Sequence, residues 1–201
     1  MPLLKSDTYT SEDYWNLPEG ERAELIDGQF YAMAPPSRIH QKLISQFTKT
    51  IGSYIDSHGG DCEVYPSPFA VNLDAEDKNW VEPDISVICD KNKLTDRGCT
   101  GAPDLIIEVV SPSTQGHDYL KKLLLYQKSG VREYWIVNPA TENVVVYKFE
   151  TNEYASYSFA EDVPVSISCG CGYSCRHVRR NAEEKAKPAY TGNQGIESNR
   201  R

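Results

Sequence analysis

The sequence contains no apolar run long enough to cross a membrane. A membrane-spanning helix needs about 18 to 20 consecutive apolar residues, and no such stretch occurs among the 201 residues. The first residues, MPLLKSDTYTSEDYW, also lack the apolar stretch of a secretory signal peptide. We therefore expect a cytoplasmic protein that is not inserted into a membrane.

The six cysteines lack the even spacing of a disulfide-rich secreted domain. Cys62, Cys89 and Cys99 are scattered along the chain, and the other three crowd into residues 169–175. We predict that all of these thiols are reduced. A zinc site in the crowded segment would use Cys169, Cys171, Cys175 and His177. That spacing is tighter than the usual C-x2-C pairs of zinc sites, so we expect no zinc there.

Basic residues are in deficit, with 21 Lys and Arg against 29 Asp and Glu and a net charge of -8. Nucleic-acid-binding surfaces are usually basic because they neutralise phosphates. The balance favours an ordinary acidic protein unless a bound metal ion offsets acidic groups at a binding site. The composition predicts one domain over residues 1–168 and an atypical tail over residues 169–201, of which 176–201 read as disordered.

Apolar periodicity and turn signals predict an α/β fold, a mixed sheet flanked by two main helices. Asp27-Gly28 within Ala23–Met33 indicates a hairpin. Apolar residues at three- and four-residue steps predict a helix over Arg38–Ser57, and a second helix is expected to end near Ser129-Gly130. The other strands are expected within residues 63–73, 84–88, 105–110, 133–137, 144–149 and 154–159.

Two carboxylates occupy short apolar segments that we expect to be strands. Asp84 lies within Val81–Cys89, and Glu108 lies within Ala102–Val110. A buried carboxylate is destabilising unless it is paired, hydrogen-bonded or bound to a metal. Glu108 therefore either pairs with a Lys or Arg of a neighbouring helix or belongs to a functional site, and its apolar strand favours the site. Asp84 alone is a weaker signal, because Asp at a strand start is often only a turn former.

Asp104 is the alternative metal ligand. It lies four residues before Glu108 on the same face, and at about 3.3 Å per residue the two would stand roughly 13 Å apart. That is too far to share one ion, so we expect Asp104 to cap its own strand. The following helix carries Lys121 and Lys122, and Tyr126 shares a face with Lys122. The alternative for the two lysines is a solvated pair on a surface helix.

Several of these residues occur in an order that resembles a known family. The matching motifs are Glu24-Leu25-Ile26-Asp27-Gly28, His40, Pro83-Asp84, PDLIIEV at 103–109, SPST at 111–114, Asp118, Lys122, Tyr126, GV at 130–131 and EYWIV at 133–137. The order resembles the Uma family of restriction endonucleases, a branch of the PD-(D/E)XK nuclease superfamily that is also described as a domain of unknown function. The resemblance runs from about Tyr14 to Ser168, and it is most specific over residues 103–137.

The resemblance implies a restriction-endonuclease-like core and a DNA endonuclease that depends on Mg²⁺ or Mn²⁺. It implies Asp84, Glu108 and the backbone carbonyl of Val109 as the metal ligands. In the superfamily the catalytic lysine normally stands two residues after the acid, where this chain has Val110. The resemblance places the lysine on the following helix instead, at Lys122.

Glu24 and His40 would extend the site, Glu24 as an outer acid or extra ligand and His40 as a neighbour. The alternatives are a surface charge on the hairpin for Glu24 and a solvent-facing helix residue for His40. The displaced lysine and the acidic net charge support a second hypothesis, a non-catalytic nuclease-fold module that binds protein or nucleic acid. Residues 134–136 fit a homodimer face, but a buried strand explains them equally well.

Overall fold

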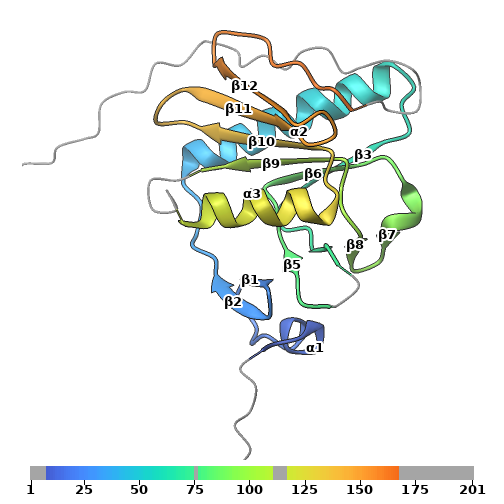
Figure 1. Cartoon of the computed structure of the whole chain (residues 1–201), viewed down its shortest axis with the longest axis vertical. Helices are drawn as coiled ribbons and strands as arrows, with labels where there is room; N and C mark the ends of the chain where they lie inside the picture. Colours follow the sequence, from blue (N-terminus) through green and yellow to red (C-terminus); the bar gives the residue numbers. More distant parts are fainter. Residues whose placement is uncertain (1–7, 75–76, 111–116, 168–201) are drawn as a thin grey trace, which may run out of the picture.

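The computed structural model describes residues 8–74, 77–110 and 117–167, with residues 117–119 described by their backbone only. A six-stranded sheet lies at the centre, in the order β12–β11–β10–β9–β6–β3 (Figure 1). Its strands are β3 Glu63–Pro66, β6 Ile85–Ile88, β9 Leu105–Val109, β10 Glu133–Asn138, β11 Asn143–Lys148 and β12 Glu153–Ser158. β9 and β10 pair in parallel and the other neighbours antiparallel. A parallel pair needs a crossover, and helix α3 (His117–Ser129) provides it.

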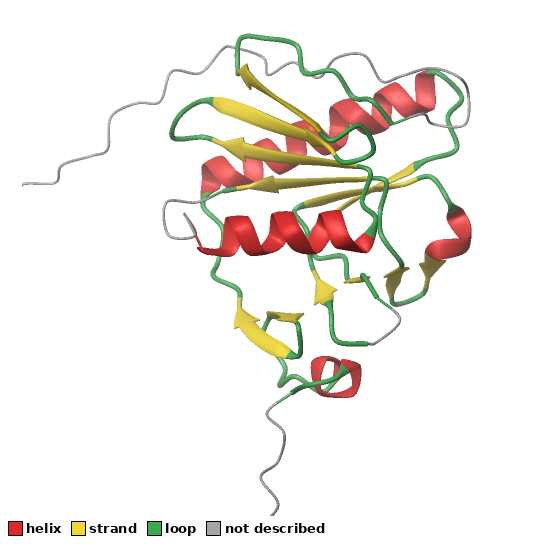
Figure 2. Ribbon diagram, viewed as in Figure 1, coloured by secondary structure: helices red, strands yellow, loops and turns green. Residues whose placement is uncertain are grey.

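Two helices cover opposite faces of this sheet, α3 in front and α2 (Arg38–Ser57) behind (Figures 1 and 2). Side chains alternate between the two faces along a strand. Ile107 of β9 therefore packs in the same core as Leu43 of α2, whereas Ile106 packs with Tyr126 of α3. The α/β architecture and the bounds of α2 confirm the sequence prediction.

A smaller sheet lies beside the large one, with strand order β2–β1–β5–β4–β8–β7. Its strands are β1 Ala23–Ile26, β2 Gln29–Ala32, β4 Val71–Asn72, β5 Trp80–Val81, β7 Leu94–Thr95 and β8 Gly98–Thr100. A 3-10 turn, η1 (Lys91–Lys93), precedes β7, and the short helix α1 (Ser11–Trp15) joins the edge near β1. This sheet carries Glu24 on β1.

Glycines are required at two positions of the smaller sheet. Asp27 and Gly28 both have positive φ, 51° and 73°, and form the predicted hairpin turn between β1 and β2. Gly98 has φ 138°, and a Cβ there would lie 2.0 Å from the carbonyl oxygen of Ala70. A larger residue at position 98 would push β8 away from the chain that leads into β4.

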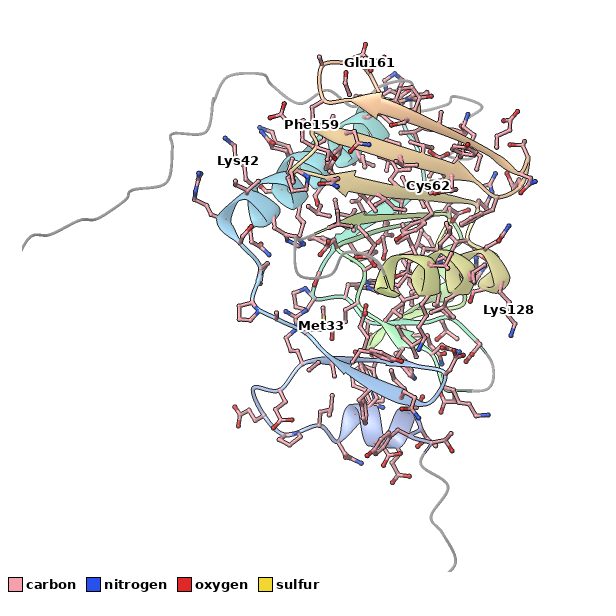
Figure 3. All side chains as sticks on the ribbon, turned by 60° about the vertical axis from the view of Figure 1, so that its left-hand side comes forward. Met33, Lys42, Cys62, Lys128, Phe159 and Glu161 are labelled. Atoms are coloured by element: carbon pink, nitrogen blue, oxygen red, sulfur yellow. A yellow bond between two sulfur atoms is a disulfide. The ribbon has the colours of Figure 1, made fainter. Side chains whose placement is uncertain are left out.

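The prediction that the cysteine thiols are reduced is wrong for one pair, because Cys62 and Cys89 form a disulfide. Cys62 (labelled in Figure 3) directly precedes β3 and Cys89 directly follows β6. The register of β3 against β6 pairs Glu63 with Ile88. Cys62 and Cys89 are the next pair beyond the strand ends, so this register brings their sulfurs together. The pairing arises from strand register, which cysteine spacing does not reveal. Cys99 is free, as expected, and it is buried; the remaining cysteines lie outside the described residues.

Two predicted strands are each divided between the two sheets. The segment 63–73 forms β3 and then β4, and the segment 81–89 forms the end of β5 and then β6. Pro66, Pro68 and Pro83 stand at or between the pieces. Proline lacks the N–H needed for a continuous ladder, which explains the breaks.

The described part of the domain reaches Ile167. Val163, Val165 and Ile167 pack into the core on the α2 side of the large sheet. The tail that was predicted to be disordered lies outside the described residues. The four residues 169, 171, 175 and 177, at which we expected no zinc, lie outside them as well. Among the helices of the described residues, none has the length and apolar character to cross a membrane.

Candidate active site

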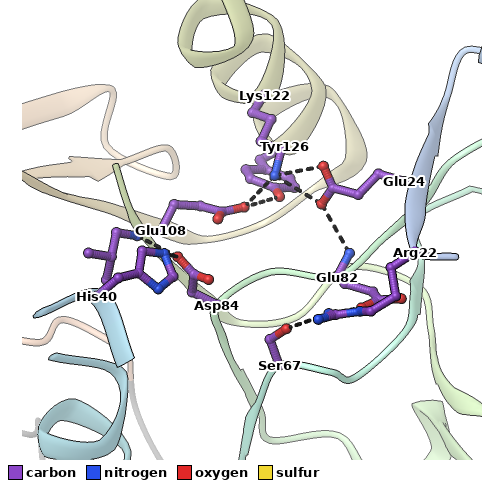
Figure 4. A network of polar contacts seen from close by, with 10 residues as sticks. Arg22, Glu24, His40, Ser67, Glu82, Asp84, Glu108, Lys122 and Tyr126 are labelled. Atoms are coloured by element: carbon purple, nitrogen blue, oxygen red, sulfur yellow. Dashed lines mark hydrogen bonds and ion pairs between the residues drawn. The ribbon is translucent and has the colours of Figure 1, made fainter. Parts of the chain in front are cut away.

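A polar cluster fills the region between β1, the start of β6, β9, α2 and α3 (Figure 4). It contains all five side chains predicted for the site, namely Glu24, His40, Asp84, Glu108 and Lys122. They come from parts of the chain nearly 100 residues apart. The fold therefore assembles the predicted set in one place, whatever its chemical role.

Asp84 is held at the start of β6 by two donors. Its Oδ2 accepts a hydrogen bond from the backbone N–H of Val109 at 2.7 Å and pairs with His40 Nε2 at 3.0 Å. Ile85 pairs with Ile107 in the antiparallel register of β6 and β9. One position further, Asp84 stands beside Glu108. The predicted approach of the two carboxylates to within about 6 Å, the span that one or two metal ions can bridge, stays a prediction.

Glu108 points to the α3 side of β9, the same side as Ile106. Its Oε1 accepts hydrogen bonds from Lys122 Nζ at 3.0 Å and from Tyr126 Oη at 2.7 Å. Burial raises the pKa of Glu108 to about 7, while Lys122 acts in the opposite direction. Asp84 also raises this pKa through its charge.

Lys122 bridges two carboxylates. Its Nζ lies 2.8 Å from Glu24 Oε2 and 3.0 Å from Glu108 Oε1. Burial acts to lower the pKa of Lys122, but Glu108 and Glu24 outweigh it and raise the pKa above its ordinary value. Lys122 is therefore charged at neutral pH. Glu24 in turn accepts a hydrogen bond from the backbone N–H of Glu82 at 3.1 Å, which fixes the far end of the bridge.

The structure bears out the prediction that Lys122, rather than Lys121, points at the carboxylates. Lys121 donates to the hydroxyl of Tyr31 and lies 4.2 Å from the centre of its ring. The helix register therefore places one lysine inside the cluster and the other outside it. The catalytic role of Lys122 stays a proposal.

His40 lies at the α2 side of the cluster with its side chain 15% exposed. Burial acts to lower the pKa of His40, but the hydrogen bond and charge of Asp84, together with Glu108, outweigh it and raise the pKa. Its Nδ1 is buried and has no hydrogen-bond partner among the described residues. The solvent-facing alternative for His40 is therefore wrong.

One oxygen of each central carboxylate is without a partner among the described residues. Among the described residues no hydrogen bond or ion pair involves Oδ1 of Asp84 or Oε2 of Glu108. The described part of the chain also contains no group of three or more His, Cys, Asp or Glu arranged to hold a metal ion. Side chains alone thus offer two carboxylates, and a metal there would need backbone oxygen or water as further ligands.

Asp104, the alternative ligand, lies elsewhere and has structural partners. Its Oδ2 accepts from the backbone N–H of Cys89 at 2.8 Å, and its Oδ1 pairs with Arg132 at 3.1 Å. Arg132 also pairs with Glu150 at 2.8 Å. Asp104 therefore ties β6 to the segment before β10, rather than capping its own strand as expected.

From the sequence, Tyr126 was expected on the Lys122 face and among the family's motif residues, but without a role at the site. The structure shows it fully buried and bonded to Glu108. Glu82 is a second member that the sequence analysis missed; its carboxylate accepts from Tyr14 Oη at 3.0 Å and pairs with Arg22. The position of Tyr126, four residues after Lys122 on the same helix face, could have indicated that its hydroxyl belongs to the cluster. No sequence feature indicated this for Glu82.

The sequence profile of the Uma2 family, described as "Putative restriction endonuclease", matches residues 11–171. The chain belongs to this family. A solved relative from Anabaena variabilis, titled a "putative nuclease belonging to DUF820", aligns with a TM-score of 0.65 at 22% identity, covering 78% of this chain and 89% of that one. That likeness supports the restriction-endonuclease-like fold.

Two further relatives come from Synechocystis. The uncharacterized protein slr1290 is 29% identical over 148 residues, which cover 73% of this chain and 75% of the relative. The uncharacterized protein sll1609 is 27% identical over 153 residues, covering 74% of this chain and 85% of the relative. The Uma2 profile spans every residue that supplies the polar cluster.

Proposed function

We propose that this protein is a Mg²⁺-dependent endonuclease that hydrolyses phosphodiester bonds in DNA, with Mn²⁺ as an alternative ion. The observation that carries the proposal is the pair Asp84 and Glu108. They stand on neighbouring strands, each offers one oxygen without a partner among the described residues, and Lys122 lies against one of them. Membership of the Uma2 family supports the same reaction class.

The residues of the cluster suit a hard divalent cation. Mg²⁺ prefers carboxylate and carbonyl oxygens and retains several waters, and the proposed ligands are Asp84, Glu108 and the backbone carbonyl of Val109. The cluster holds three carboxylates: Glu24 and Glu108 share the ammonium group of Lys122, and Asp84 pairs with His40. Added positive charge is therefore favoured there. A bound Mg²⁺ would polarise the scissile phosphate and lower the pKa of a coordinated water.

The protein's own groups orient the reacting atoms. Lys122 and Tyr126 both hold Oε1 of Glu108, which directs the other oxygen away from α3. Glu24 positions Lys122 Nζ, and His40 positions Asp84. Lys122 would orient the attacking water or stabilise the charge that develops on the phosphate, as preorganised donors do in other transition states.

The second hypothesis, a non-catalytic module with a nuclease fold, has its own support. Val110 occupies the usual lysine position and the net charge is -8. Only two acidic side chains present partner-free oxygens among the described residues of the cluster. This module would bind protein or nucleic acid without cleaving it.

The two hypotheses differ in a cleavage experiment. Supercoiled plasmid is incubated with the protein in Mg²⁺, Mn²⁺ or EDTA, beside Asp84→Asn and the pair Lys122→Met and Lys121→Met. The endonuclease predicts metal-dependent nicking that Asp84→Asn and Lys122→Met abolish and Lys121→Met retains. Nicking that survives Asp84→Asn would contradict the role proposed for Asp84, and absence of nicking on supercoiled, linear and single-stranded DNA would favour the non-catalytic module.

A further inference from the structure

A surface cleft of about 870 Å³ lies outside the active site. It is lined by α1, by Trp80 of β5 and by the turn between β7 and β8. Leu25 and Trp80 pack together with Tyr14, whereas Ile26 and Val81 pack in the core beneath α3. Because side chains alternate along a strand, the cleft and Glu24 lie on opposite faces of the smaller sheet.

Two tryptophans form part of the wall. Trp15 is 39% exposed, and its ring meets Trp80 edge to face at 5.1 Å between centres. The guanidinium of Arg97 lies 5.3 Å from the centre of the Trp15 ring. This is the distance at which a cation is attracted to an aromatic face.

Acidic side chains outnumber basic ones in the lining, with Glu12, Asp77 and Asp96 facing the single cation Arg97. Asp77 has structural partners, Ser11 and Asn72. In the described part of the chain, Glu12, Asp96 and the guanidinium of Arg97 make no hydrogen bond or ion pair with a side chain. The carboxylates are thus available to a cation other than Arg97.

We propose that this cleft binds an arginine or lysine side chain from a basic segment of a partner protein, and that Arg97 stacks on Trp15 when the segment is absent. The aromatic face attracts a cation, and the surplus carboxylates favour a ligand with more positive charge than Arg97 alone. The same carboxylates repel phosphate, so the cleft does not suit nucleic acid. The partner's cation would displace Arg97 from the Trp15 face.

The removal of Arg97 gives the most specific test, because it relieves an internal competitor. Binding of a synthetic Arg-Gly repeat peptide is measured by calorimetry and tryptophan fluorescence at low ionic strength, beside a Glu-Gly repeat and a single-stranded oligonucleotide. Arg97→Ala should tighten binding of the basic peptide about 5-fold, and Trp15→Ala should weaken it by a similar factor. The double variant Glu12→Gln with Asp96→Asn should weaken it further.

Asp61→Asn is the matched control, because Asp61 is exposed and does not line the cleft. It should bind the peptide as the unmodified chain does. Glu12, Asp96 and Arg97 are exposed, so these variants keep the test valid if Trp15→Ala fails to fold. The proposal is overturned if neither the unmodified chain nor Arg97→Ala binds the basic peptide, or if Arg97→Ala weakens binding. It is also overturned if Asp61→Asn weakens binding as much as the double variant, or if the oligonucleotide alone binds and requires Arg97.

Discussion

Two glutamates occupy apolar strands that lie side by side in the large sheet, and their surroundings differ. Glu108 on β9 faces α3, with its side chain 12% exposed and one oxygen without a described partner. Glu133 on β10 is 1% exposed and uses both oxygens, accepting from Trp135 Nε1 at 2.6 Å and from the backbone N–H of Ser166 at 2.8 Å.

The comparison separates a buried carboxylate that builds the fold from one that is available for chemistry. Neutral donors satisfy Glu133 completely, and it ties the segment around Ser166 to the sheet. Glu108 has a buried cation, Lys122, on one oxygen, and its other oxygen has no partner in the described part of the chain. An acid within an apolar strand is thus not by itself a sign of a catalytic site; the spare oxygen next to a cation is the distinguishing feature.

The largest expected contrast is in cleavage activity. Glu108→Gln should reduce Mg²⁺-dependent nicking at least about 1000-fold, as removal of a ligand to a catalytic metal would. Glu133→Gln should leave nicking per folded molecule within a few-fold. The rates are measured on the same plasmid after the folded fraction of each variant is determined by circular dichroism. Equal losses in both variants would remove the distinction between the two acids.

Stability should show a second contrast, at Lys122. Lys122→Met leaves Glu24 and Glu108 without their shared cation and should destabilise the fold by about 3 kcal/mol, the scale for breaking a buried pair. Lys121→Met removes a partly exposed contact to Tyr31 and should change stability by less than about 1 kcal/mol. Urea denaturation in EDTA measures both. Similar values would mean that Lys122 is hydrated rather than buried.

A third contrast concerns pH and the charge of Glu108. Because its pKa is raised from 4.5 to about 7, the folded state holds a proton that the unfolded state releases. Stability should therefore fall as pH rises from about 4.5 to 7, by about 1–3 kcal/mol. Glu108→Gln should flatten this decline in metal-free urea titrations, beyond the part that Glu133 contributes. If the unfolding free energy of Glu108→Gln falls with pH as steeply as that of the unmodified chain, the raised pKa does not belong to Glu108.

The smallest effect is expected at the hydroxyl of Tyr126. Tyr126→Phe removes the hydrogen bond to Glu108 and should cost about 1 to 2 kcal/mol of stability, since the ring stays buried. It should also weaken Mn²⁺ binding, because Oε1 of Glu108 keeps only Lys122 as a donor. Melting curves with and without Mn²⁺ measure both effects. Trp135→Phe, which removes a donor to Glu133, should lower stability without changing the shift caused by Mn²⁺.

Local patterns were sufficient to predict much of the large sheet and its helices. The apolar period of residues 38–57 predicted α2 with its observed bounds, and Asp27-Gly28 predicted the hairpin. The position of Glu108 in an apolar strand indicated a site. The resemblance to the family added Lys122, His40 and Glu24, whose spacing alone did not require a role.

Long-range pairing accounts for what the sequence did not reveal. The disulfide Cys62–Cys89 depends on the register of β3 against β6. β4 and β5 are two residues each, too short to show a period, so the smaller sheet was not predicted. The bonds of Glu133 and Tyr126 likewise depend on residues distant in the chain, and for this reason the role of Glu133 was missed.

The most direct test of the proposed metal site is a crystal of the protein soaked in Mn²⁺ and measured for anomalous scattering. The account predicts a peak within about 2 to 2.5 Å of one oxygen of Asp84 and one of Glu108, with the two carboxylates within about 6 Å of each other and Lys122 still bound to Glu108. A well-ordered site without a peak there, or with the two carboxylates facing opposite sides of the sheet, would contradict it.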